Sequence, residues 1–266
     1  MVTKAEGPGW TLYLGRWQDT PLADLEPDAV LTDPPFGERT HGGQRHGRKE
    51  ARYTKDATTA CLAGSGFAYD HWTDEDVVEF VEHWSPRTSG WIGAMTSHDL
   101  VPVYSTAMEA AGRYVFAPIS CVQHARNIRL AGDGPANWTD HLVVSRPRDG
   151  AWLSARKVRR ERAGLNTSLP GAYVGPSHDI GENSLDRSKR ITGGKPLWLM
   201  RAIIRDYTRP GDLVVDPCAG GATTLLAAVI EGRRAIGAEM DPDTFALAKA
   251  RLERGYTPTF DFGEAS

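Results

Sequence analysis

The stretch from Asp212 to Thr224 reads DLVVDPCAGGATT, and it indicates the fold of this 266-residue chain. Its apolar run, Leu213–Asp216, ends in an acid and is typical of a strand that is covered on both faces of a sheet. The two adjacent glycines that follow let the backbone turn tightly and let a ligand approach it closely. A helix-like run begins at Thr223. The stretch therefore predicts a strand, a turn and a helix, with a ligand site at the turn.

Strand and helix signals alternate through the rest of the chain. Short apolar runs predict strands at Thr11–Leu14, Ala29–Thr32, Gly90–Met95, Arg113–Ile119, His141–Val144, Leu213–Asp216 and Arg234–Glu239. Three helices have start or stop signals: Thr73 and Asp76 form a capping box, Pro196 suits a first helical position, and Asp241 opens a last helix that Gly255 can close. This alternation predicts an α/β fold, a doubly wound, mostly parallel sheet with helices on both faces.

Composition excludes several classes of protein. Hydrophobic residues make up 40% and charged residues 24%, which suffices for a packed core and excludes wholesale disorder. No run of eighteen apolar residues occurs, and Met1–Trp10 has no apolar stretch, so we expect no membrane span and no signal peptide. Cys61, Cys121 and Cys218 are odd in number and lack C-x-x-C spacing. This argues against disulfides and structural zinc, and it favours the reducing cytoplasm.

Positive charge is concentrated in one segment. From Ser145 to Lys195, eleven lysines and arginines stand against five acids, although the whole chain has a net charge of -3. The segment lacks apolar periodicity and is rich in glycine and proline, so it is either a functional loop or a solvated charged one. A second basic, glycine-rich stretch runs from Gly37 to about Asp70. We expect residues 1–144 and 195–266 to form two halves of one domain, with 145–194 as a small irregular insertion.

A second motif, Asp33-Pro34-Pro35-Phe36, directly follows the predicted strand Ala29–Thr32. One interpretation is a turn that merely ends the strand. The other is chemical, because two prolines fix φ and remove two backbone donors, so the Asp33 carboxylate and the Pro34 carbonyl can face one spot as acceptors. Such a pair suits an NH2 group, and Phe36 offers a surface for a ring. The motif therefore fits substitution at the nitrogen of an aromatic amine.

An acid, Glu239, ends the strand that follows the glycine turn, eighteen residues beyond Gly221. A carboxylate at about this spacing suits the two hydroxyls of a ribose. A tight turn followed by a surface acid is the alternative. A dinucleotide site is less consistent with the sequence because G-x-G-x-x-G is absent, and a P-loop is excluded because no Gly-Lys-Ser/Thr follows.

Together, these motifs resemble those of the DNA amino-methyltransferases that use S-adenosylmethionine. Residues Asp33 to Phe36 are similar to the catalytic D-P-P-Y/F motif of that family, and Asp216 to Thr224 to its cofactor loop. Residues Gly237 to Asp241 resemble the following strand end, and Thr192 to Leu197 the T-Q-K-P segment. The catalytic motif precedes the cofactor loop, with the basic segment between them, which is the order of the beta class.

The resemblance implies a Rossmann-like methyltransferase sheet, S-adenosylmethionine as cofactor, no metal, and methylation of double-stranded DNA by base flipping, with 145–194 as the target-recognition segment. It implies a catalytic group of Asp33, Pro34, Pro35 and Phe36. It implies a cofactor-binding group of Asp33, Lys195, Pro196, Asp216, Pro217, Cys218, Ala219, Gly220, Gly221, Thr223, Thr224, Glu239, Met240 and Asp241. The basic stretches suggest phosphate contacts from Arg45, Arg48, Lys49, Arg156, Lys157, Arg159 and Arg160.

The acceptor base is less strongly indicated than the reaction. We expect N6 of adenine, because in the resembling family Ser at the position of Asp33 accompanies the cytosine enzymes more often. Methylation of cytosine N4 and a non-catalytic cofactor- or DNA-binding module are the alternatives. A protein amide fits less well, since those enzymes tend to carry Asn-Pro-Pro-Tyr. The sequence leaves open the recognition site, a restriction endonuclease partner and a homodimer.

Overall fold

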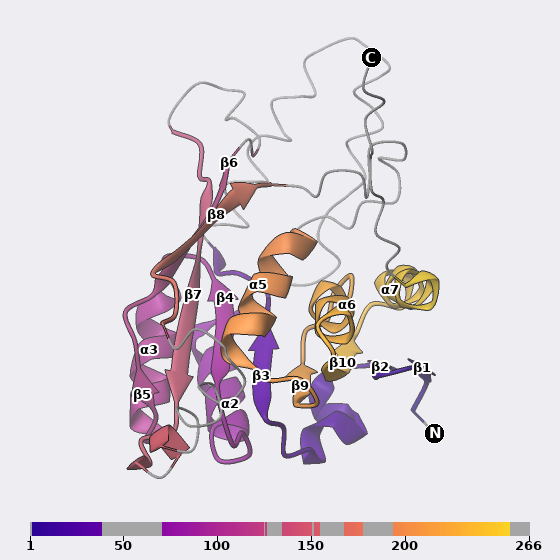
Figure 1. The fold of residues 1–266 in the computed structure, drawn as a ribbon, viewed down its shortest axis with the longest axis horizontal. Helices are drawn as coiled ribbons and strands as arrows, with labels where there is room; N and C mark the ends of the chain where they lie inside the picture. Colours follow the sequence, from indigo (N-terminus) through magenta and orange to yellow (C-terminus); the bar gives the residue numbers. More distant parts are fainter. Residues whose placement is uncertain are drawn as a thin grey trace.

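The computed structural model describes residues 2–38, 71–124, 126, 135–150, 152–154, 168–177 and 194–255. Within these residues ten strands form one sheet, in the order β1-β2-β10-β9-β3-β4-β7-β6-β8, with β5 paired to β7 (Figure 1). The strands are β1 (Lys4–Gly7), β2 (Trp10–Leu14), β3 (Ala29–Thr32), β4 (Ile92–Thr96), β5 (Tyr114–Val115), β6 (Ile119–His124), β7 (Thr139–Arg146), β8 (Ala172–Pro176), β9 (Leu213–Asp216) and β10 (Arg234–Glu239). The α-helices are α2 (Asp74–Trp84), α3 (Val101–Ala110), α5 (Leu197–Tyr207), α6 (Thr223–Ile230) and α7 (Pro242–Arg254), and two 3-10 helices are η1 (Trp17–Asp19) and η2 (Pro21–Asp24).

The centre of the sheet is parallel and its flanks are mixed. Strands β2, β10, β9, β3 and β4 run parallel, so their carboxyl ends share one edge of the sheet. Strand β7 is antiparallel to both β4 and β6, which brings the amino end of β7 to that same edge. The chain order reverses between β9 and β3, which makes their carboxyl ends the expected place for a ligand.

Helices cover both faces of the sheet, as the alternation of strands and helices predicts. In β3, Ala29 and Leu31 pack into the core beneath α5, α6 and α7, whereas Val30 packs into the core beneath α2 and α3. All four residues of β3 are buried, which explains why this strand appears in the sequence as a continuous apolar run. No described helix is long and apolar enough to cross a membrane.

The predicted helix signals are largely confirmed. The Thr73 hydroxyl accepts from the Asp76 N–H while the Asp76 carboxylate accepts from the Thr73 N–H, so the capping box of α2 is complete. Asp241 caps α7 and Gly255 ends it with a positive φ of 67°. The prediction that Pro196 takes the first helical position is wrong by one residue. Pro196 is the N-cap residue before α5, and the helix begins at Leu197.

Four features of the fold differ from the sequence prediction. The predicted strand Arg113–Ile119 is two strands, β5 and β6, and their pairings with β7 differ by one residue in register. The break contains Pro118, which has no N–H to donate to a partner strand. Strand β1 and helix α3 were not predicted, and neither was β8, which lies inside the segment 145–194 that was expected to be irregular.

Candidate active site at the carboxyl edge of the sheet

Asp33 directly follows β3 and begins the turn Asp33-Pro34-Pro35-Phe36. The turn is fastened to the loop after β4, because the Gly37 N–H donates to the Ser97 hydroxyl at 3.2 Å. A Cβ on Gly37 would lie 2.3 Å from a carboxylate oxygen of Asp99, so a larger residue here would require the Asp99 side chain to shift. The prolines and this close contact hold the turn at the edge of the sheet.

Lys195 is the immediate partner of Asp33. Its Nζ atom lies 2.7 Å from both carboxylate oxygens of Asp33, and 4.6 Å from the centre of the Phe36 ring. Burial raises the pKa of Asp33, and the positive charge of Lys195 opposes that rise. The predicted catalytic Asp33 and Phe36 and the predicted cofactor residue Lys195 are therefore brought together, although 162 residues separate Lys195 from Asp33.

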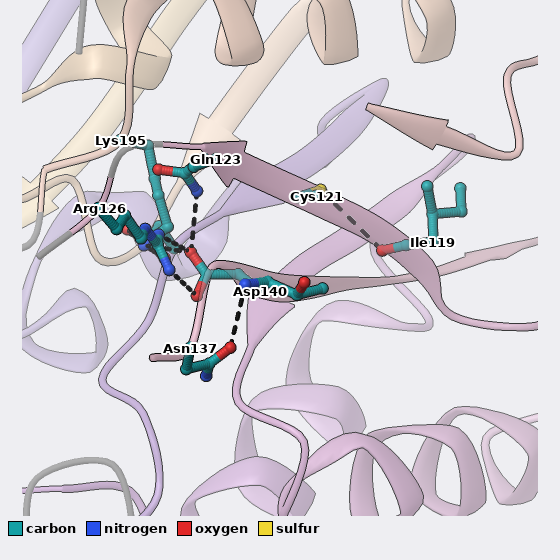
Figure 2. Close-up of polar contacts among 9 residues, drawn as sticks. Ile119, Cys121, Gln123, Arg126, Asn137, Asp140 and Lys195 are labelled. Carbon is teal, nitrogen blue, oxygen red and sulfur yellow. Dashed lines mark hydrogen bonds and ion pairs between the residues drawn. The ribbon is translucent and has the colours of Figure 1, made fainter. Parts of the chain in front are cut away.

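Asp140, at the amino end of β7, is a second carboxylate beside Lys195. Its Oδ2 atom lies 3.7 Å from Lys195 Nζ. Arg126 donates to both oxygens of Asp140, at 2.8 Å to Oδ1, and Gln123 Nε2 donates to Oδ2 at 3.1 Å. Figure 2 shows the side chains of Gln123, Arg126 and Lys195 converging on this carboxylate. Burial works to raise the pKa of Asp140, but Lys195 and Arg126 outweigh it and hold that pKa below its usual value.

Asp216 ends β9 and connects the two strand-end motifs. Its Oδ1 atom accepts from the Thr32 hydroxyl at 2.6 Å and from the Cys218 N–H at 3.1 Å. Burial raises the pKa of Asp216 to about 6, although hydrogen bonds from Thr32, Thr224 and Cys218 act against that rise. Since Thr32 precedes Asp33, this hydrogen bond ties β3 and the predicted catalytic turn to β9, the strand that leads into the glycine turn.

The turn after β9 runs close against β10. The Ala219 N–H donates to the Ala238 carbonyl at 2.8 Å, and a Cβ on Gly237 would lie 3.0 Å from the Ala219 Cβ. Gly220 and Ala222 both have a positive φ, of 49° and 57°. Among the described residues, Ala222 is the only non-glycine residue with a positive φ. A Cβ at Gly220 would meet nothing within 4 Å, so the turn leaves open space on its outer side.

Glu239 ends β10 beside this turn. Its Oε1 atom accepts from the Asp241 N–H at 2.8 Å, and the Gly220 N–H is also hydrogen-bonded to it. Burial raises the pKa of Glu239. Of its predicted companions, Met240 is half exposed, and one oxygen of Asp241 accepts from the Thr244 N–H as the helix cap.

The predicted residues divide into two groups. Those on the ends of β3, β9 and β10 and at the start of α5 share the carboxyl edge of the sheet. The predicted phosphate contacts Arg45, Arg48, Lys49, Arg156, Lys157, Arg159 and Arg160 lie outside the described residues, so their role stays a prediction.

Sequence reasoning missed Thr32, Gln123, Arg126 and Asp140. None belongs to a recognisable motif, and the available signal for Asp140 was its position next to the predicted strand His141–Val144. Among the described residues, no group of His, Cys, Asp or Glu side chains is arranged to hold a metal ion.

Comparison with known proteins finds similarity to DNA methylases. Residues 146–250 match the model of a DNA methylase family. The chain is 39% identical over 59 residues to DNA adenine methyltransferase YhdJ of Escherichia coli, which is 22% of this chain and 20% of that protein. It is 28% identical over 123 residues to the type II methyltransferase M.MthZI of Methanothermobacter thermautotrophicus, which is 42% of this chain and 34% of the relative. The matches thus span about a fifth to a third of these relatives' lengths.

Solved structures show that the chain shares a fold with DNA methyltransferases. The structure of M1.HpyAVI in complex with SAM has a TM-score of 0.59 at 18% identity, covering 91% of this chain and 99% of that one. The cytosine-N4-specific PvuII DNA methyltransferase also has a TM-score of 0.59, at 15% identity, covering 91% of this chain and 85% of that one. The doubly wound, Rossmann-like sheet of this chain is therefore the fold that these methyltransferases share.

Proposed function

We propose that the chain transfers a methyl group from S-adenosylmethionine to N6 of adenine in double-stranded DNA. The observation that carries this proposal is the position of Asp33, which stands at the end of β3 and is tied through Thr32 and Asp216 to the glycine turn after β9. An acceptor for an amine and a turn suited to a nucleoside thus lie at adjacent strand ends. The family of residues 146–250 and the adenine enzyme YhdJ support the same reaction.

The residues around the glycine turn fit S-adenosylmethionine. Open space at Gly220 leaves room for a ligand against the backbone, and the buried carboxylate of Glu239 suits ribose hydroxyls. Asp33 and Asp216 add carboxylates at the same edge, which suits a positively charged sulfonium. When bound, S-adenosylmethionine supplies an electrophilic methyl group.

Asp33 and Pro34 prepare the acceptor nitrogen. The lone pair of an exocyclic amine is delocalised into the base, so the amine is a weak nucleophile. The Asp33 carboxylate and the Pro34 carbonyl each accept one N–H and help to localise that lone pair on nitrogen. As the new N–C bond forms, Asp33 receives the proton that the amine must lose. Correct positioning of reactants contributes several kcal/mol, up to about 7–11.

The target base must leave the duplex before it reaches Asp33, so the proposal includes base flipping, with the base stacked on Phe36. Lysines and arginines of 145–195 would neutralise phosphates, and fewer side chains would read base edges. Type II methyltransferases stand among the relatives, but a partner endonuclease and a homodimer stay predictions.

Methylation of cytosine N4 is the second candidate. Its support is the cytosine-N4-specific PvuII enzyme, which has the same fold, so the fold does not discriminate between the two bases. Both reactions use an exocyclic amine, and the geometry proposed for Asp33 and Pro34 serves either one.

The first test is nucleoside mass spectrometry of duplex DNA incubated with S-adenosylmethionine. We expect wild type to form N6-methyladenine and Asp33→Ala to form none while it still binds the cofactor. The control is Glu26→Ala, which removes an exposed carboxylate between η2 and β3 and leaves methylation unchanged. N4-methylcytosine would overturn the choice of base, and cofactor binding without any methylated nucleoside would favour a non-catalytic module. Equal loss of cofactor binding in Asp33→Ala would contradict the role given to Asp33.

A further inference from the structure

Lys195 occupies the place that the target amine needs. Its ammonium lies 2.7 Å from both oxygens of Asp33, whereas the proposed reaction requires Asp33 to accept an N–H of the target base. The Lys195 side chain is 7% exposed, so it cannot simply leave Asp33 for bulk water without losing its burial. A buried ammonium needs another anion or acceptor when it gives up the first one.

Asp140 is the available second anion. Its Oδ2 atom is already 3.7 Å from Lys195 Nζ, and its side chain is 4% exposed. An ionised carboxylate offers about four lone-pair sites. Arg126 and Gln123 fill three of them with hydrogen bonds, two on Oδ2 and one on Oδ1, so the site left for the ammonium is on Oδ1. Figure 2 shows the side chain of Lys195 beside that of Arg126, close to the Asp140 carboxylate.

We propose that Asp140 is a positioning residue that takes over the Lys195 ammonium and thereby frees Asp33 for the target amine. This inference rests on the proposed function. Arg126 and Gln123 hold the Asp140 carboxylate still while Lys195 moves between two anions that it already contacts. No proton is transferred and no covalent bond changes in this movement. The charges of the two acids and two bases, Asp33, Asp140, Lys195 and Arg126, therefore stay balanced throughout.

A purely structural role for Asp140 makes a different prediction. In that case the Arg126–Asp140 pair only joins the ends of β6 and β7, and removing either partner has the same consequence. Under the proposal the two partners act oppositely on Lys195. Without Asp140, Lys195 stays on Asp33. Without Arg126, the unpaired Asp140 attracts Lys195 more strongly and Asp33 is freed.

Steady-state kinetics of the full chain on duplex DNA separate the two roles. At saturating S-adenosylmethionine we expect Asp140→Asn to lower kcat about ten- to hundred-fold, as misplaced reacting groups do. We expect Arg126→Gln to lower kcat at least ten times less. The control is Glu231→Gln, which removes a different carboxylate that pairs with two arginines, Arg201 and Arg205. Each kcat is divided by the fraction of folded protein at the assay temperature, which is obtained from thermal unfolding of the same variant. Equal losses in Asp140→Asn and Arg126→Gln, or wild-type kcat in Asp140→Asn, would overturn the proposal.

A measurement without DNA or turnover tests the second contact directly. Lysine side chains are labelled with 15N, and the Lys195 signal is identified by its loss in Lys195→Arg. We expect the Lys195 ammonium protons to stay protected from exchange in Asp33→Asn, because Asp140 holds them, and to lose protection in Asp33→Asn/Asp140→Asn. Equal protection in the two variants would show that Asp140 does not receive the ammonium. If wild type methylates no DNA, the proposed function fails while this measurement still decides the role of Asp140.

Discussion

Asp216 is a buried acid whose ionisation works against folding. Its Oδ1 atom holds Thr32 and the Cys218 N–H, yet burial raises its pKa from 3.8 to about 6. A pKa that is higher in the folded chain means that the folded chain binds the proton more tightly. The contribution of this tighter proton binding to the free energy of unfolding is fully present below pH 3.8 and is lost as the pH rises through about 6.

Replacing Asp216 by Asn should remove that loss. The amide oxygen can still accept from Thr32 and Cys218, but it never ionises. We expect the free energy of unfolding of Asp216→Asn, relative to wild type, to rise by about 2 kcal/mol between pH 4 and pH 6.5, since one pKa unit is about 1.4 kcal/mol. Urea denaturation across that range measures it, with the exposed Asp19→Asn as control. A difference that is independent of pH would refute this account of Asp216.

At this scale the sequence revealed the residues that belong to motifs and missed their partners. Asp33, Asp216 and Glu239 could be found because each ends an apolar run, and an acid at that position is unusual. Asp140 and Arg126 could not, because their neighbourhood with Lys195 arises from pairing between β4, β7 and β6, which no local pattern encodes.

The element that depends most on close packing is β10, where the glycine turn rests on Gly237. A Cβ there would lie 2.9 Å from the Leu225 Cδ1 atom and 3.0 Å from the Asp216 carbonyl oxygen. We expect Gly237→Ala to lower the free energy of unfolding by about 1–3 kcal/mol, as overpacking does, and to weaken cofactor binding by shifting the turn.

The matched control is Gly171→Ala, because a Cβ at Gly171 meets nothing within 4 Å and its φ is not positive. Chemical denaturation and calorimetric titration with S-adenosylmethionine measure the two effects. Equal stability of Gly237→Ala and Gly171→Ala would show that the turn accommodates the added Cβ at Gly237 without a loss of folding free energy.

Elements with strong local signals were predictable, and those defined by their neighbours were not. The capping box of α2 and the Asp241–Gly255 boundaries of α7 are encoded within a few residues. Strand β8 is five residues long and pairs with β6 some fifty positions earlier, so its sequence alone resembles a loop. The split between β5 and β6 follows from Pro118, but the register offset depends on β7.

At the scale of the whole molecule, the proposed binding of DNA by a chain of net charge -3 requires a local basic region. We expect DNA affinity to fall steeply with salt, and Arg159→Ser/Arg160→Ser to reduce the slope of log affinity against log salt by about 2, since each phosphate contact contributes about 0.9. Fluorescence anisotropy at several salt concentrations measures the slope.

The control for charge is Arg205→Ser/Arg209→Ser, because these arginines pair with Glu231 and Asp212 at the far end of α5. An unchanged slope in Arg159→Ser/Arg160→Ser, or an equal change in the control, would contradict a role for the segment 145–194 in DNA binding.

The hydrogen bond between Thr32 and Asp216 joins positions 184 residues apart, within a sheet in which β3 and β9 are already paired. Strands bonded in this way cannot slide past one another. The separation between the end of β3 and the glycine turn after β9 is consequently fixed by the sheet. Under the proposed function, adjustment during methyl transfer would fall instead to side chains such as Lys195 and to the substrate base.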